Sequence, residues 1–440
     1  MRVALVIAGD IDAGSGGFYY DRRLRDRLRE RGHAVDVVSL PRGSPARKLA
    51  ANLRARRIAG RLSGADIVVE DGLAHPAVLG VNRRLSVPTV ALVHMIAARA
   101  RGGSDVCAAV ARTAVRTVER RFLRSVDAAV YNAETTRRDA AALGGPSRHV
   151  VAPPAGDRFD PEVTPAAIRD RARRGTAGSD RAGGRTASRG RAGELTMGPG
   201  ASTTRTGGAA DGSGPLELTF LGNVAPRKGL DDLVAGLRRV DRTDVDWRLT
   251  VVGDRTVDPA HVAAVEDAVA AAGAADRVRF TGRLDDDAVA ARLRETHVLA
   301  VPSRYEPFGM VYLEGMGFGC VPVATTAGGA AEFVRDGESG FLVDPDSPAG
   351  IAAAVRRLDD RDRLARMGVA ARADYESRPT WTATLDRAID FLESVVGGKR
   401  VTGRSATDGE RDREQERSAG GNSAAGGESL PEPRPSGETI

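Results

Sequence analysis

Residues 301–340 read VPSRYEPFGMVYLEGMGFGCVPVATTAGGAAEFVRDGESG and indicate a strand, a loop and the start of a helix. The apolar run from His297 to Val301 stops at Pro302, and the loop that follows carries Glu306. A helical pattern then begins at about Phe308-Gly309. The stretch therefore predicts a buried strand whose end leads into the N-terminus of a helix.

The start of this predicted helix is suited to bind an anion. The first amides of a helix have no partner inside it and lie at the positive end of its dipole, so Gly309, Met310 and Val311 are expected to hold a diphosphate. The loop would place Glu306 beside that anion. Glu314 follows in a mostly apolar segment, where an unpaired carboxylate is costly to bury. We expect it to face water or to accept hydrogen bonds from a partner such as vicinal hydroxyls.

The motif E-P-F-G-x-x-x-L-E-G-M at residues 306–316, with Gly328-Gly329 and Glu332 downstream, resembles the signature of retaining, nucleotide-sugar-dependent glycosyltransferases of GT-B family 4 (group 1). One Glu in a loop and one on a helix are common on solvated surfaces, but the combined spacing is specific. The resemblance implies that Glu306 lies by the donor sugar, that Glu314 binds the donor ribose and that the amides between them contact the phosphates.

Composition sets limits on the class of protein. The 440 residues are enough for two domains, and a hydrophobic content of 41% is typical of a soluble globular protein. No apolar run approaches the roughly 20 residues of a membrane helix. The N-terminal MRVALVIAGD is too short for a signal peptide, so we expect a cytoplasmic protein, with a peripheral position on the inner face of the cell membrane as an alternative. Cys107 and Cys320 form neither a metal motif nor a disulfide framework, which favours packing roles.

The net charge is +6, and the positive charges are almost all arginines, because Lys48, Lys228 and Lys399 are the only lysines. A basic balance suits nucleic acid, an anionic membrane or a phosphorylated substrate. Aromatic residues make up only 4% of the chain, and no basic motif is rich in them. We therefore expect no nucleic acid partner.

Apolar strands alternate with helical patterns in both halves of the chain; one expected helix runs over residues 47–62. This alternation predicts parallel β-α-β units and an α/β fold with an open, doubly wound sheet in each half, whose ligands bind at the carboxyl ends of the strands. By resemblance the fold is GT-B, with two facing Rossmann-like domains and a C-terminal helix that crosses back to the first.

The chain is expected to divide at changes of composition. Two segments are rich in small and polar residues and lack the bulky apolar residues that a core needs, so we expect both to be disordered. The expected divisions are an N-terminal acceptor-side domain (1–157), a disordered insertion (171–214), a C-terminal nucleotide-sugar-binding domain (215–378), a crossover helix (379–396) and a disordered tail (397–440).

Two features of the first half are candidate donor contacts. A glycine loop at residues 9–17 follows the first strand, and by resemblance Gly16 and Gly17 in it reach the donor diphosphate, although the G-x-G-x-x-G dinucleotide fingerprint is missing. His94 directly follows the apolar run TVALV; a lone His there is more often structural, but by resemblance it approaches the donor sugar. His75 is a weaker candidate for acceptor contact.

Residues 222–229, GNVAPRKG, resemble the family's G-R-x-x-x-x-K-G loop, whose Arg and Lys hold the donor phosphates. Lys228 matches this pattern. Asn223 stands where the family has Arg, which puts one charge in doubt, and Arg227 is the expected substitute. By resemblance, Arg283 lies where family members contact the nucleobase.

Arg112, Arg116, Arg120 and Arg124 follow one another at four-residue spacing in a predicted helix. That spacing places four guanidinium groups on one face. A solvated charged face is the commoner meaning of such a pattern. The functional alternative is a docking strip for anionic lipid head groups or a phosphorylated carrier.

These features predict a metal-independent, retaining glycosyltransferase of the hexosyltransferase type, with Glu306, Lys228 and His94 as catalytic residues, a nucleoside-diphosphate sugar as donor and a lipid-linked, glycan or small-molecule hydroxyl as acceptor. No cofactor and no metal are expected. Two alternatives remain: a catalytically silent nucleotide-sugar-binding protein, because of Asn223, and a two-domain nucleotide-dependent oxidoreductase. The residues expected to bind the donor are Gly16, Gly17, Asn223, Arg227, Lys228, Arg283, Phe308, Gly309, Met310, Val311 and Glu314.

Overall fold

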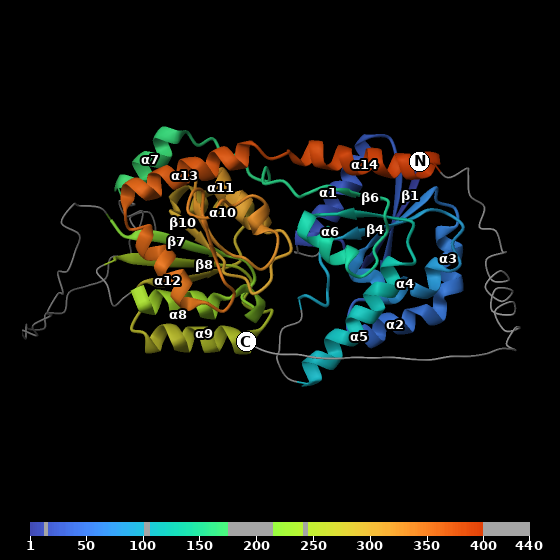
Figure 1. Ribbon diagram of the computed structural model, residues 1–440, viewed down its shortest axis with the longest axis horizontal. Helices are drawn as coiled ribbons and strands as arrows, with labels where there is room; N and C mark the ends of the chain where they lie inside the picture. Colours follow the sequence, from blue (N-terminus) through green and yellow to red (C-terminus); the bar gives the residue numbers. More distant parts are fainter. Residues whose placement is uncertain (13–15, 101–105, 175–213, 241–244, 399–440) are drawn as a thin grey trace, which may run out of the picture. The chain divides into compact units, whose positions relative to one another are not determined.

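The computed structural model describes residues 1–12, 16–100, 106–174, 214–240 and 245–398 (Figure 1). Met1–Val396 form one compact unit. The expectations of disorder for residues 175–213 and 399–440 lie outside the described residues. Among the helices described, none is long and apolar enough to cross a membrane.

The first half contains a six-stranded parallel sheet with the order β2-β1-β3-β4-β5-β6. Its central strands are buried along their whole length, as expected for a sheet covered on both faces. The strand order reverses between β1 and β3, which is where open α/β sheets bind ligands. The strands are β1 (Arg2–Ala8), β2 (Ala34–Leu40), β3 (Ile67–Asp71), β4 (Thr89–Val93), β5 (Ala128–Tyr131) and β6 (His149–Val151).

Helices cover both faces of this first sheet. One core cluster joins the sheet to the apolar faces of α1 and α14, and a second joins its other face to the helices from α3 to α5. The helices of this half are α1 (Gly16–Glu30), α2 (Pro45–Ala50), η1 (Ala51–Arg54), α3 (Ala55–Leu62), η2 (Gly72–Ala74), α4 (His75–Asn82), α5 (Val106–Leu123) and α6 (Glu134–Ala141).

The second half repeats the architecture, with a six-stranded parallel sheet in the order β12-β11-β10-β7-β8-β9 around a core of its own. Its strands are β7 (Leu216–Leu221), β8 (Trp247–Val252), β9 (Val278–Gly282), β10 (Val298–Ala300), β11 (Val321–Thr325) and β12 (Phe341–Val343). Its helices are η3 (Pro226–Lys228), α8 (Leu230–Val240), α9 (Pro259–Ala271), α10 (Asp286–Glu295), α11 (Met310–Gly317), η4 (Ala330–Glu332), α12 (Pro348–Arg357) and α13 (Arg361–Glu376).

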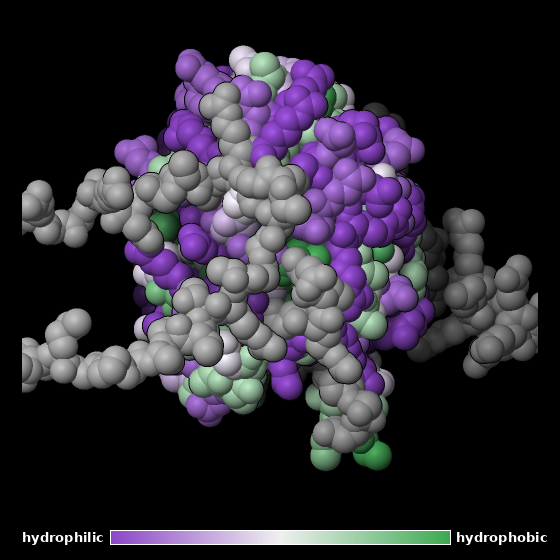
Figure 2. Space-filling view, turned by 90° about the vertical axis from the view of Figure 1, so that its left-hand side faces the viewer, coloured by the Kyte–Doolittle hydropathy of each residue, from purple (hydrophilic) through white to green (hydrophobic). Residues whose placement is uncertain are grey.

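The face drawn in Figure 2 is mainly hydrophilic, and its hydrophobic residues form small separate areas.

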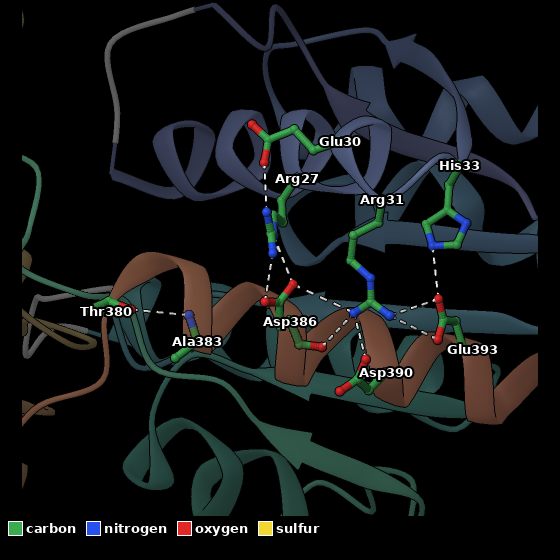
Figure 3. A network of polar contacts seen from close by, with 9 residues as sticks. All are labelled: Arg27, Glu30, Arg31, His33, Thr380, Ala383, Asp386, Asp390 and Glu393. Carbon is green, nitrogen blue, oxygen red and sulfur yellow. Dashed lines mark hydrogen bonds and ion pairs between the residues drawn. The ribbon is translucent and has the colours of Figure 1, made fainter.

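Helix α14 (Trp381–Gly397) packs on the first sheet although it follows the second in the chain (Figure 1). Trp381 is fully buried, with its ring centroid 5.5 Å from that of Tyr20. On the side facing α1, acidic residues of α14 pair with Arg27, Arg31 and His33 (Figure 3). The crossing of this helix to the first domain agrees with the GT-B expectation.

Two expectations about local structure are wrong. The helix expected over residues 47–62 is interrupted by η1, where Asn52 donates to the Pro76 carbonyl at 2.7 Å and accepts from the Gly80 amide at 2.6 Å. These bonds tie the chain to α4 instead of continuing one helix. Residues 171–174, expected to belong to the disordered insertion, form the last turn of α7 (Pro165–Arg174), where Ala172 is buried.

Candidate active site

The centre of the site is an ion pair between two loops of the second domain. Lys228 Nζ lies 2.5 Å from Glu306 Oε2, and each side chain is only 14% exposed. Lys228 ends η3 after β7, and Glu306 lies in the loop after β10. These strands are neighbours in the sheet, so their carboxyl ends deliver both side chains to one place.

The surroundings of Glu306 keep its carboxylate ionised. Burial by itself raises its pKa, but the charges of Lys228 and Arg227 and hydrogen bonds from Lys228 and Ser303 lower the pKa below its ordinary value. Ser303 Oγ donates to the same carboxylate oxygen at 3.3 Å. Glu306 is therefore a fixed acceptor, suited to receive hydrogen bonds from hydroxyl groups.

Gly328 and Gly329 hold the backbone of Glu306. Gly329 N donates to the Glu306 carbonyl at 3.0 Å, and Glu306 N donates to the carbonyl of Ala327 at 3.0 Å. Gly328 has a φ of +134°, and a Cβ added there would lie 1.8 Å from the Glu306 carbonyl oxygen. The glycine pair of the motif thus allows the close approach that aims Glu306 at Lys228.

Helix α11 begins beside this pair. Its N-cap, Gly309, has a φ of +97°, and a Cβ there would lie 2.4 Å from the Tyr312 ring. The first-turn amides of Met310 and Val311 have no acceptor within the helix, because their i−4 residues precede it. Phe308 is only 3% exposed and packs on Phe333 with a centroid separation of 5.2 Å. The side chain of Phe308 is therefore a core residue.

The Lys228 loop is shaped by close backbone contacts. A Cβ added at Gly229 would lie 2.1 Å from the Pro302 carbonyl oxygen. Arg227 Nη1 donates to the Tyr305 carbonyl at 2.9 Å and lies 3.8 Å from Glu306 Oε2. Arg227 thus supplies a second positive charge at the ion pair, whereas the side chain of Asn223 is exposed.

Glu314 lies on α11 close to Arg158. It is 4% exposed and lies 3.7 Å from Arg158 Nη1, so it neither faces water nor stands unpaired. Burial raises its pKa, which Arg158 opposes. Arg283 is 65% exposed and lies 3.8 Å from Asp254, at the carboxyl ends of β8 and β9.

The structure places Gly16 and Gly17 in the first turn of α1, and not in a loop as expected, with Gly17 close to His94. A Cβ added at Gly17 would lie 3.2 Å from His94 Cδ2, and one at Gly16 would lie 2.8 Å from Met310 Cε at the start of α11. The lack of a side chain thus allows Gly17 to lie close to His94 and Gly16 to lie close to the Met310 side chain. His94 Nε2 is 2.8 Å from Asp21 Oδ1.

The expected acceptor contact, His75, is 6% exposed and is held by a 2.7 Å hydrogen bond between its Nδ1 and the Gly72 carbonyl. Burial lowers its pKa to about 4, so the ring is neutral at pH 7. It lines a small apolar cavity with residues that include Glu119 and Phe122. This arrangement indicates a structural histidine.

The four arginines lie along α5 and just beyond its end. Arg116, Arg120 and Arg124 are exposed and Arg112 is half-buried. Val106 and Val110, on the first turns of the same helix, are also exposed, at 78% and 65%. The helix therefore presents apolar as well as basic side chains to solvent.

Among the described residues, the His, Cys, Asp and Glu side chains close enough to hold a metal ion are Asp21, Asp71 and His94, with one atom of each within 4.8 Å of the others. The Nε2 nitrogen of His94 already makes a hydrogen bond of ordinary length to Asp21. This contact indicates that a proton lies between His94 Nε2 and Asp21 Oδ1.

Sequence reasoning missed Asp21 and Ser303. Asp21 had a signal, because it lies on the same helical face as Leu24 and Leu28, where a charged residue is unexpected. Ser303 had none, since a serine after a strand is an ordinary turn residue.

Two Rossmann-like domains, each with a parallel six-stranded sheet, and a C-terminal helix packed on the first domain define the GT-B fold. The sequence model described as "Glycosyl transferase 4-like domain" matches residues 2–156, and the one described as "Glycosyl transferases group 1" matches residues 215–360. The chain belongs to this family of glycosyltransferases, GT-B family 4.

Curated relatives match part of the chain. Glycogen synthase of Mycobacterium tuberculosis is 36% identical over 183 residues, which are 39% of this chain and 42% of that protein. D-inositol 3-phosphate glycosyltransferase of Thermomonospora curvata is 32% identical over 194 residues, 43% of this chain and 44% of that protein. The chain thus spans less than half the length of these relatives.

Solved structures show the same fold over nearly all of the chain. Sucrose-phosphate synthase from Thermosynechococcus elongatus superposes with a TM-score of 0.70 and 19% identity, covering 90% of this chain and 100% of that one. Anabaena Alr3699/HepE in complex with UDP superposes with a TM-score of 0.63 and 17% identity, again covering 90% and 100%.

Proposed function

We propose that this protein transfers a sugar from a nucleoside diphosphate to an acceptor hydroxyl, with retention of anomeric configuration and without a metal ion, in the synthesis of a glycan, glycolipid or polysaccharide. The observation that carries the proposal is the buried pair of Lys228 and Glu306 beside the open amides of α11. Relatives point the same way, since they include a glycogen synthase and a GDP-mannose-dependent mannosyltransferase.

Charge explains the arrangement. When the glycosidic bond to the diphosphate breaks, negative charge grows on the leaving group, so positive groups fixed in advance lower the barrier. Lys228, Arg227 and the first amides of α11 supply such groups, and therefore no divalent ion is needed. In this proposal the leaving phosphate acts as base on the same face of the sugar, which gives retention.

The two carboxylates of the site accept hydrogen bonds from hydroxyl groups of the donor. Lys228 keeps Glu306 ionised, and Glu306 orients the sugar. Glu314 accepts hydrogen bonds from the ribose hydroxyls after Arg158 moves away from it. His94 approaches the sugar from the first domain. Arg283, exposed at the ends of β8 and β9, contacts the nucleobase.

A thermal-shift panel of UDP-, GDP-, ADP- and dTDP-sugars tests the donor class, because a ligand that binds only the folded state raises the melting temperature. We expect one base to give a clear shift, and transfer assays with that donor should be unaffected by EDTA. A product with inverted configuration by NMR would refute retention. Binding without transfer or hydrolysis would favour the silent binding protein.

Lys228→Ala tests the assigned chemistry. We expect kcat to fall by about 100-fold or more, because a charge that stabilises the leaving group is lost. Arg238→Ala, which changes an exposed arginine of α8, is the control and should keep wild-type turnover. Near-normal transfer by the Lys228 variant would rule out its role.

We further propose that α5 docks the protein on anionic membrane. Its basic residues lie on a helix that also exposes Val106 and Val110, and each basic side chain near such a surface contributes about 1 kcal/mol. Sedimentation with anionic vesicles should show binding that is lost when Arg112, Arg116, Arg120 and Arg124 are all replaced by Gln. Unchanged binding would reject the proposal. The control variant carries Gln at four basic positions of the second domain, namely Arg238, Arg239, Arg356 and Arg366.

A further inference from the structure

A carboxylate with one hydrogen-bond partner lies in the core of the first domain. Asp21 of α1 is 0% exposed and shares the apolar face of that helix with Leu24 and Leu28. Its Oδ1 is 2.8 Å from His94 Nε2, and its Oδ2 has no hydrogen-bond partner among the described residues. Burying an ionised carboxylate is costly unless it is paired, so the contact with His94 is the feature that makes this Asp tolerable.

The histidine ring is held in one orientation. The His94 carbonyl accepts from Asn132 Nδ2 at 2.8 Å, and the ring stands edge-on to Tyr20 at a centroid separation of 5.2 Å. Gly17 approaches the ring so closely that a Cβ would lie 3.2 Å from Cδ2. None of the described residues hydrogen-bonds Nδ1. The ring therefore turns Nε2 to Asp21 and leaves Nδ1 for another partner.

The charges around His94 come from three elements. Asp21 faces it from α1, and Asp71 lies close at the end of β3. Lys48 of α2 is near Asp71, with its ammonium donating to the Leu73 carbonyl at 2.8 Å. Burial lowers the pKa of His94, but the charge and hydrogen bond of Asp21, aided by Asp71, raise it above the ordinary value overall.

We propose that Asp21 is a positioning residue that keeps His94 protonated on Nε2 and presents Nδ1 as a charged donor to the sugar hydroxyl or the leaving phosphate. The inference rests on the proposed function for the identity of that ligand. The contact between His94 and Asp21 does not depend on the proposed function.

The first test needs no substrate. In full-length protein labelled with ¹⁵N-histidine, His94 is assigned by comparison with His94→Gln, and its titration is followed by NMR. We expect protonated Nε2 throughout and a titration above the ordinary value of about 6.5. In Asp21→Asn the titration should move down by about one pH unit or more.

The second test uses turnover. If His94 must be protonated, activity falls as pH rises through its pKa, so in Asp21→Asn that fall should begin at lower pH. We expect kcat at neutral pH to drop about tenfold or more, as for loss of a charged hydrogen bond, with KM for the donor within about twofold. Asp127→Asn is the control, because Asp127 bonds Thr89 at the opposite end of β4.

The outcomes separate the two proposals. A shifted His94 titration in a protein that transfers no sugar supports the coupling and refutes the function. Active Asp21→Asn with wild-type titration and pH profile overturns the inference alone. If Asp21→Asn does not fold, the wild-type titration decides, since a His94 that titrates below the ordinary value also overturns it.

Discussion

Lys228 Nζ and Glu306 Oε2 lie 2.5 Å apart although 78 positions separate the two residues in the chain. The pair joins the loops after β7 and β10, and the backbone of Gly328 lies against that of Glu306. One buried contact thus links the three motifs recognised in the sequence of the second domain. Its strength therefore affects the stability of the domain and its proposed chemistry together.

Glu306→Gln should lower the free energy of unfolding at neutral pH. The pKa of Glu306 is lower in the folded protein than in the unfolded chain, so its ionised form stabilises the fold above about pH 4.3, and this contribution is lost as pH falls through the folded pKa. At pH 7 we expect the variant to lose about 1–3 kcal/mol in urea unfolding, since Lys228 loses its charged partner. The difference from wild type should shrink as the pH falls through the lowered pKa of Glu306.

The control for this prediction is Glu376→Gln, which removes an exposed partner of Arg372. Exposed pairs contribute little, so its unfolding curve should nearly match that of wild type at each pH. A Glu306 variant equal to wild type at pH 7 would contradict the assignment.

Arg227, not Asn223, should provide the second charge of the phosphate site. Arg227 lies 3.8 Å from Glu306 and is tied to the Tyr305 carbonyl, whereas Asn223 is exposed. We expect Arg227→Gln to lower kcat/KM for the donor about 10- to 100-fold. Asn223→Ala should change it less than about threefold. The reverse ranking in steady-state assays would place the charge elsewhere.

The spacing of apolar residues predicted the α/β alternation, and the family resemblance placed Lys228 and Glu306 at one donor site. Their direct contact was not predicted, because it depends on β7 and β10 being neighbours in the sheet. Sequence reasoning could not predict the interruption at η1, because this depends on bonds from Asn52 to α4, which lies more than twenty residues away. The burial of the Phe308 side chain could not be predicted either. Its position in the motif suggested a donor contact, but packing on Phe333 buries the side chain.

The first domain was less predictable than the second. His94 could be singled out, since it ends a strand, but its partner Asp21 lies 73 residues away on α1. In the second domain, Glu314 was expected to face water or to accept hydrogen bonds from a partner such as vicinal hydroxyls, and its ion-pair partner Arg158 comes from the segment that leaves the first domain. Long-range pairs of charged residues leave no periodic pattern in one sequence.

Gly328→Ala should be strongly destabilising. The residue has a φ of +134°, and the new methyl carbon would lie 1.8 Å from the Glu306 carbonyl oxygen, so both the backbone and the space oppose it. We expect a loss of more than about 2 kcal/mol in urea unfolding, together with weaker donor binding as Glu306 shifts.

Gly337→Ala is the matched control for that variant. Gly337 also has a positive φ, +75°, but nothing lies within 4 Å of the added Cβ. Only backbone strain is introduced, so the cost should be about 1 kcal/mol and donor binding should be unchanged. Equal losses in the two variants would mean that contact with Glu306 plays no part.

The ion pairs of Arg31 should stabilise the packing of α14 on the first domain. Its guanidinium lies 2.6 Å from Asp390 and 3.2 Å from Glu393, and the neighbouring Arg27 pairs with Asp386 (Figure 3). A network of this kind on a partly exposed surface contributes more than isolated pairs and is screened by salt. We expect Arg31→Gln to lower the melting temperature by about 1–3 °C at low ionic strength and by less in 1 M NaCl.

Arg25→Gln is the control for the α14 network, because Arg25 pairs with its neighbour Asp26 on α1 and not with α14. Its melting temperature should stay within about 0.5 °C of wild type at either ionic strength. Hydrogen exchange should show faster opening of α14 in the Arg31 variant alone, since the lost pairs hold that helix. If α14 exchanges at the wild-type rate when Arg31 is replaced, Trp381 and the other apolar residues of the helix are sufficient to hold it on the first sheet.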